Sequence, residues 1–114
     1  MGTSGFDIQT FLNYLGQDHE LAVELLTAFV EDAPLRLKSL AEAVQAGDAD
    51  NAVRAAHSLK GMCGVVRDQP STALALELEM AGRRSDLEAL RAGLPKLEQA
   101  LAGILEQART FLAT

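Results

Sequence analysis

Apolar residues recur along the chain in steps of three and four, which is the spacing of one face of an α-helix. Two series are long enough to be seams between the helices of a bundle. No segment alternates apolar and polar residues as a half-buried strand would. The first series, within residues 18–46, is Ala22, Leu26, Phe29, Ala33, Leu37, Leu40 and Val44, and the second is Leu87, Leu90, Leu94, Leu97, Leu101, Ile104, Ala108 and Phe111.

Pro34 interrupts the first series, for which Asp18 is the expected N-cap. A proline inside a helix removes one backbone donor and clashes with the carbonyl four residues back. Two arrangements follow from it, one kinked helix or a second helix capped by Asp32. The apolar register passes through Pro34 without a slip, which favours one kinked helix that ends at Gly47.

Shorter helical segments stand between polar breaks. Residues 6–15 predict a short lid helix that ends at Gly16. Asp48 or Asp50 is expected to cap a helix over residues 51–66.

The break at residues 67–71 precedes a fourth segment that runs to about Gly82, with Leu74, Leu78 and Ala81 inside. Ser85 and Glu88 have the spacing of a capping box and predict the start of the last helix. Four long helices, short connections and one lid predict an all-α fold, an antiparallel up-down four-helix bundle with a short N-terminal lid helix. We expect one domain over residues 6–112 and a flexible N-terminus at residues 1–5.

Charge and composition narrow the possible functions. The formal net charge is −6 and the pI is near 4.8, which disfavours nucleic-acid binding because phosphates require a basic surface. No run of about 18 apolar residues exists, so membrane insertion is not expected. The one cysteine, Cys63, cannot form an internal disulfide, which fits a reducing, cytoplasmic location.

The segment 51–66, NAVRAAHSLKGMCGVV, contains one of the two histidines on a helix with two distinct faces. Its apolar stripe is Ala52, Ala55, Ala56, Leu59, Met62, Cys63 and Val66. The other face carries His57 together with Val53, Arg54, Lys60, Gly61 and Gly64. A glycine inside a helix costs about 0.5–1 kcal/mol relative to alanine. Two glycines beside the histidine therefore indicate that another molecule approaches this face closely.

The motif AHSLKG at 56–61, followed by Gly64, resembles the signature of histidine-containing phosphotransfer (HPt) domains. Further similarity spans residues 6–112: Phe6-Asp7, FVEDAP at 29–34, AGD at 46–48, Leu78-Glu79 and AGR at 81–83. One departure is Arg67-Asp68, which stands where the family usually has a turn of small residues. The shape of the loop into the following helix is therefore not set by the resemblance.

The resemblance implies that His57 accepts a phosphoryl group from the aspartyl phosphate of a receiver domain and passes it to an aspartate of another. Lys60 would offset the incoming charge, and Arg54 would assist. Glu79 would hold the Nδ1–H tautomer of the imidazole and leave Nε2 free to attack. Val53, Arg54, Gly61 and Gly64 would contact the partner.

The chain has no nucleotide-binding motif, so we expect a phosphohistidine carrier without its own ATP site and not an autonomous enzyme. We expect no cofactor and no metal site here, with Mg²⁺ on the partner receiver domain. The implied partners are receiver domains of a hybrid sensor kinase or a response regulator, bound by a monomer.

Two other readings remain open. One is a helical adaptor, or a degenerate HPt-like module, that docks a receiver without carrying phosphate. The other is the dimerisation domain of a sensor kinase, which Ser58 and Leu59 disfavour because an acidic residue usually follows the histidine there.

Overall fold

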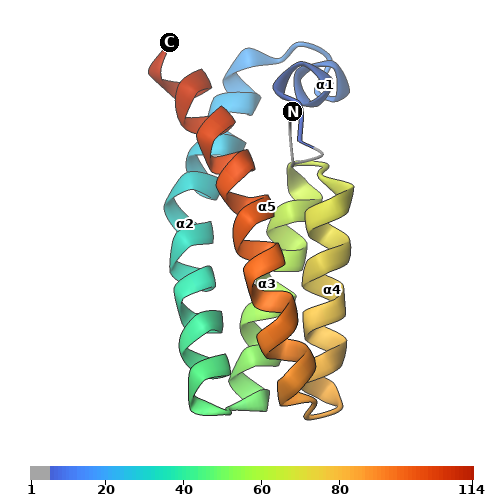
Figure 1. Ribbon diagram of the computed structural model, residues 1–114. Helices are drawn as coiled ribbons and strands as arrows, with labels where there is room; N and C mark the ends of the chain where they lie inside the picture. The colour runs from blue at the N-terminus through green and yellow to red at the C-terminus, as the bar shows by residue number, and fades with distance from the viewer. Residues whose placement is uncertain (1–5) are drawn as a thin grey trace.

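The computed structural model describes residues 6–114, which form five helices. The lid helix is α1 (Ile8–Tyr14), and the long helices are α2 (His19–Ala46), α3 (Ala49–Val65), α4 (Gln69–Arg83) and α5 (Leu87–Ala113). The long helices run alternately up and down, and α1 lies across the end of the bundle where α2 begins and α5 ends (Figure 1). The all-α bundle with a lid is confirmed. The flexible N-terminus predicted for residues 1–5 lies outside the described residues.

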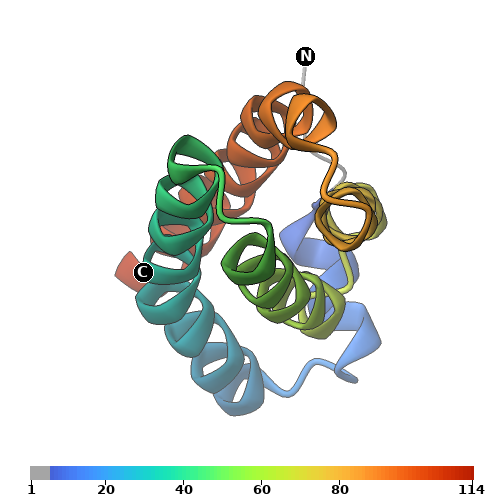
Figure 2. The same ribbon diagram turned by 90° about the horizontal axis from the view of Figure 1, so that it is seen from below.

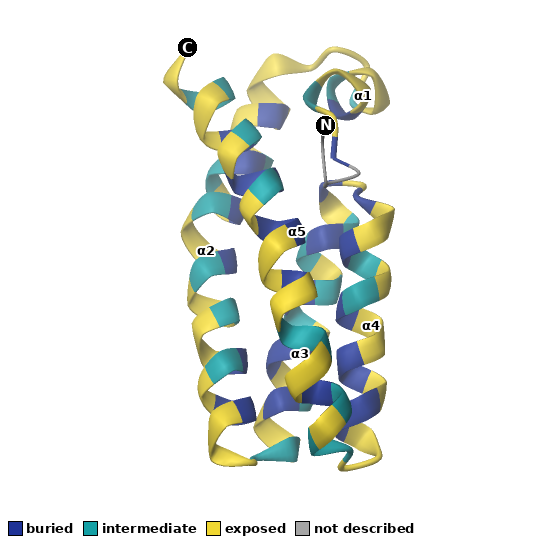
Figure 3. Cartoon of the chain, in the orientation of Figure 1, coloured by how far each residue is buried: buried dark blue, intermediate teal, exposed yellow. Residues whose placement is uncertain are grey.

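The four long helices close on one another around a single core. Each packs against two neighbours, in the cyclic order α2, α3, α4, α5, and the view along the bundle shows this ring (Figure 2). Buried positions line the inward faces of the long helices (Figure 3). In α2 the buried residues include Leu26, Phe29, Ala33 and Leu40. The apolar series and a single helix through Pro34 are therefore confirmed, while the kink at Pro34 stays a prediction.

An aspartate begins every helix, because its carboxylate accepts a hydrogen bond from a backbone N–H three residues further on. Asp48 caps α3, which decides between the two predicted caps. The predicted capping box of Ser85 is wrong. Asp86 caps α5 instead, accepting from the N–H of Ala89 at 3.1 Å, while Ser85 has a left-handed backbone with φ of 54°.

The connections between long helices share one turn geometry. A residue with positive φ, at Gly47, Arg67 or Ser85, precedes the capping aspartate, whose N–H donates to a carbonyl five residues back. Arg67, with φ of 62°, thus stands where a small residue is usual. Its guanidinium lies 4.0 Å from the centre of the Tyr14 ring. This cation–π contact ties α1 to the turn between α3 and α4.

Gly82 permits the close approach of α4 to α3. A Cβ atom at this position would lie 2.6 Å from Val53 Cγ2 and 3.3 Å from the carbonyl oxygen of Ala49. We expect Gly82→Ala to lower the free energy of unfolding by about 1–3 kcal/mol through overpacking. The matched control is Gly64→Ala, where a Cβ would meet nothing within 4 Å and the variant should gain about 0.5–1 kcal/mol. Urea denaturation measures both, and a Gly82→Ala variant as stable as the parent would contradict this packing.

Candidate functional site

The site is centred on His57, which α3 holds with 63% of its side chain exposed. Nδ1 of the ring lies 3.1 Å from Oε2 of Glu79, which α4 brings to the same place from 22 residues away. Glu79 is buried, with 5% of its side chain exposed. The resemblance predicted this pairing of His57 with Glu79, and the structure brings the two together.

Glu79 is the centre of a small charge cluster. Its Oε1 lies 2.8 Å from Nζ of Lys60, and its Oε2 accepts a hydrogen bond from Arg83 at 2.7 Å. The contacts with Lys60 and then Arg83 lower the pKa of Glu79 to about 2, despite burial, which acts in the opposite direction. The carboxylate is therefore ionised at neutral pH.

The ionised carboxylate fixes the tautomer of the imidazole. An ionised carboxylate can only accept hydrogen bonds, so the neutral ring must carry its proton on Nδ1 and donate it to Glu79. The lone pair is then on Nε2, which has no hydrogen-bond partner among residues 6–114. A nitrogen lone pair on an exposed ring is a nucleophile.

Open space surrounds the ring along α3. A Cβ atom added at Gly61 or Gly64 would meet nothing within 4 Å, as the sequence had indicated. Beside the ring is a shallow depression, which we call the His57 depression. Its lining residues come from α3 and α2: His57, Ser58, Gly61, Met62, Val65, Asp32 and Arg36.

The other predicted site residues lie around this centre. Arg54 is exposed and lines the groove between α2 and α3. Val53 is half-buried and packs towards Gly82 of α4. Lys60, with 30% of its side chain exposed, neutralises Glu79 in this structure. Cys63 is a fully buried core residue, and burial raises the pKa of its thiol to about 11.

Sequence reasoning missed three residues of the site. Arg83 had a local signal, because it follows Glu79 by four positions on the same helix face. Asp32 lies in the FVEDAP segment that resembles the family, but nothing in the sequence placed it or Arg36 at the histidine, because only the packing of α2 against α3 brings them there.

The low pKa of Glu79 predicts a pH-dependent stability. Its folded-state pKa, about 2, is below the ordinary glutamate value of 4.5, so the stabilisation is fully present above pH 4.5 and is lost as the pH falls towards 2. This difference corresponds to on the order of 3 kcal/mol. We expect Glu79→Gln to be less stable than the parent at pH 7, with the gap narrowing between pH 4.5 and pH 3.

Urea denaturation at pH 7, 5 and 3 measures this gap. Glu77→Gln, which changes an exposed carboxylate on the same helix, is the matched control and should follow the parent at every pH. A gap between Glu79→Gln and the parent that stays constant from pH 7 to pH 3 would contradict the charge cluster.

Within the described residues, no group of three or more His, Cys, Asp and Glu side chains is placed to hold a metal ion. None of the helices over residues 6–114 combines the length and the apolar character needed to cross a membrane.

A known protein family matches most of the chain. The model of the Hpt domain family matches residues 24–110, which is most of the chain. The chain belongs to the Hpt domain family and is a phosphotransfer intermediate of two-component signalling, a class that exchanges phosphoryl groups with receiver domains.

Among solved structures, the fold is similar to the crystal structure of histidine-containing phosphotransfer protein B (HptB) from Pseudomonas aeruginosa PAO1. The TM-score is 0.85 at 27% sequence identity, with 98% of this chain and 97% of that chain covered. No match was found among curated proteins.

Proposed function

We propose that His57 is the residue that carries the phosphoryl group in this relay. The observation that supports the proposal most strongly is the exposed ring whose Nδ1 contacts a buried, ionised Glu79. That contact orients the ring and makes Nε2 the attacking nitrogen. Glu79 acts through His57 and is therefore a positioning residue.

The transfer step needs one nucleophile and a free approach. The Nε2 lone pair of His57 attacks phosphorus of an aspartyl phosphate, forming a P–N bond as the P–O bond breaks and the aspartate leaves as a carboxylate. The phosphorylated ring is cationic and still donates Nδ1–H to Glu79, whose negative charge stabilises it. In the onward step, a carboxylate of the second receiver attacks phosphorus, and the P–N electrons return to the imidazole.

Charge compensation and access come from the neighbours of His57. A phosphoryl group adds up to about two negative charges, and Lys60 lies one helical turn away with part of its side chain exposed. Arg54 lies one turn before the ring and forms no ion pair among residues 6–114, although its charge helps to lower the pKa of Asp48. We assign Lys60 and Arg54 to charge compensation, and Val53, Arg54, Gly61 and Gly64 to the surface that contacts the receiver.

We further propose that the partners are receiver domains of a hybrid sensor kinase or of a response regulator, which supply Mg²⁺. The chain would act as a monomer, because its long helices bury their apolar faces against one another. We propose a cytoplasmic location, which the single buried thiol at Cys63 supports.

A two-stage relay experiment tests this function. The chain is incubated with a phosphorylated receiver and Mg²⁺, re-isolated, and then given a second, unphosphorylated receiver. We expect label on the chain that is labile to acid and stable to base, followed by label on the second receiver. Label that remains on the first receiver while the two proteins bind would instead identify a docking module that carries no phosphate.

A further inference from the structure

The His57 depression is bordered on α2 by two opposite charges. Asp32 and Arg36 are one helical turn apart, and both line this depression together with Gly61 and Val65 of α3. Both are exposed. Any protein that approaches the histidine over the unobstructed surface at Gly61 must therefore pass close to this pair.

Neither charge of the pair is engaged by another side chain in the part of the chain that the structure describes. Their spacing of four residues would allow a mutual ion pair, yet neither has a hydrogen bond or an ion pair with any residue in the range 6–114. Lys60 and Arg83 differ, because both contact Glu79. Asp32 and Arg36 are thus charges beside the ring that remain available to another molecule.

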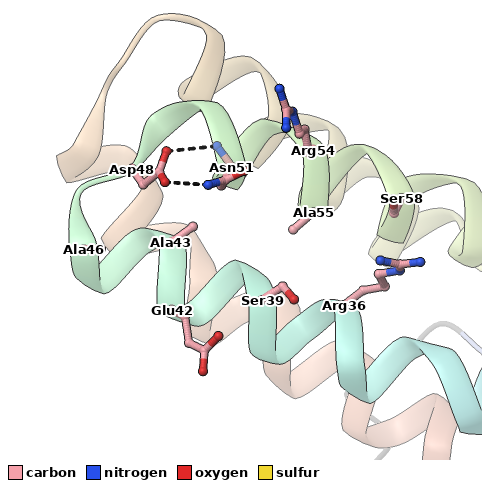
Figure 4. Close-up of a pocket in the computed structure, with 10 residues that line it drawn as sticks. All are labelled: Arg36, Ser39, Glu42, Ala43, Ala46, Asp48, Asn51, Arg54, Ala55 and Ser58. Carbon is pink, nitrogen blue, oxygen red and sulfur yellow. Dashed lines mark hydrogen bonds between the residues drawn. The ribbon is translucent and has the colours of Figure 1, made fainter.

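Arg36 also reaches beyond its own helix. Its side chain extends from α2 towards Ser58 of α3, while Glu42 points away from α3 (Figure 4). At the far end of this groove, the carboxylate of Asp48 accepts a hydrogen bond from the side chain of Asn51. Arg36 therefore lines both this groove and the His57 depression, and no acidic side chain among residues 6–114 forms an ion pair with it.

Apolar side chains complete the surface. Met62 is half-buried, and Val65, with 49% of its surface exposed, lies on the α3 side of the depression. An apolar centre with charges at its border is the usual anatomy of a protein interface. Charges at such a border act mainly on partner choice and on association rate.

We propose that Asp32 and Arg36 select the receiver, because a cognate receiver places a carboxylate opposite Arg36 and a cation opposite Asp32, one helical turn apart. This inference rests on the proposed function and adds the charge pattern of the partner to it. It assigns the pair to docking and leaves the chemical step to His57.

The test measures the rate of phosphoryl transfer against receiver concentration for Arg36→Glu. We expect the receiver concentration at half-maximal rate to rise at least about tenfold, equivalent to about 1.4 kcal/mol, with an unchanged rate at saturation. The matched control is Lys38→Glu, which reverses an exposed cation on the same helix outside the depression and should stay within about twofold of the parent.

Salt dependence supplies a second readout. At about 1 M salt the Debye length falls to about 3 Å, so the difference between Arg36→Glu and Lys38→Glu should largely disappear. Circular dichroism establishes that both variants are folded.

The outcomes separate this inference from the proposed function. If the parent chain accepts label and the two variants have equal half-maximal concentrations, the selection role is overturned while the carrier function stands. A lower saturating rate for Arg36→Glu at an unchanged half-maximal concentration would also overturn it, since Arg36 would then act on chemistry. If the parent chain accepts no label, the proposed function itself fails.

Discussion

Replacement of His57 by glutamine is expected to reduce phosphoryl transfer to background while the bundle stays folded. The side chain is 63% exposed, so its loss removes little packing. A glutamine amide can still donate a hydrogen bond to Glu79, but it has no nitrogen lone pair that is a competent nucleophile. The measurement is label accepted from a phosphorylated receiver, with the melting temperature as a check of the fold.

The second histidine of the chain offers a matched control for this substitution. His19 is exposed at the start of α2, where its ring lies tilted against that of Phe111 with the ring centres 4.9 Å apart. His19→Gln should accept label at the rate of the parent. Equal label on His57→Gln and the parent would place the phosphoryl group on another residue.

The next largest effect on phosphoryl transfer is expected from Gly61→Arg, which places a long side chain in the open space beside the ring. A Cβ atom at Gly61 meets nothing within 4 Å, so the bundle can accept the new side chain without repacking. Arginine is also a better helix former than glycine, by up to about 1 kcal/mol. We expect the fold to persist and the transfer rate to fall at least about 100-fold, because the donor can no longer approach in line.

Gly61→Ala separates crowding from backbone effects. It removes the glycine but adds only a methyl group, so transfer should stay close to that of the parent while stability rises by about 0.5–1 kcal/mol. Single-turnover transfer and urea denaturation give the two quantities. A Gly61→Arg variant that transfers at the parental rate would contradict a close approach on this face.

The helices could be predicted because their signals are local. The apolar series of α2 continues through Pro34, and the structure has one helix there. The miss at Ser85 has a local cause as well. Ser85 and Glu88 fit a capping box, but Asp86 offers a better acceptor one residue later, and the chain turns with a left-handed residue at 85. Ser85 and Asp86 are adjacent candidates for the N-cap, and the spacing of residues alone did not show which of them caps the helix.

The site likewise contains residues that share one helix, which the sequence could predict, and residues that only tertiary packing brings together. His57, Gly61 and Gly64 share one helix, so their common face follows from the helical period. The pairing with Glu79 came only from the resemblance, since it depends on how α3 packs against α4. No sequence pattern indicated that Glu79 would be buried in contact with both Lys60 and Arg83. The same holds for Asp32 and Arg36, which tertiary packing alone brings to the ring.

The central claim is that Glu79 holds Nδ1 and that Nε2 of His57 carries the phosphoryl group. Nuclear magnetic resonance of the phosphorylated chain, with ¹⁵N in its imidazole rings, tests this most directly through the coupling between phosphorus and nitrogen. We predict coupling to Nε2 of His57 and a proton retained on Nδ1. Coupling to Nδ1 of His57, coupling to His19, or phosphorus bound to no ring nitrogen would contradict it.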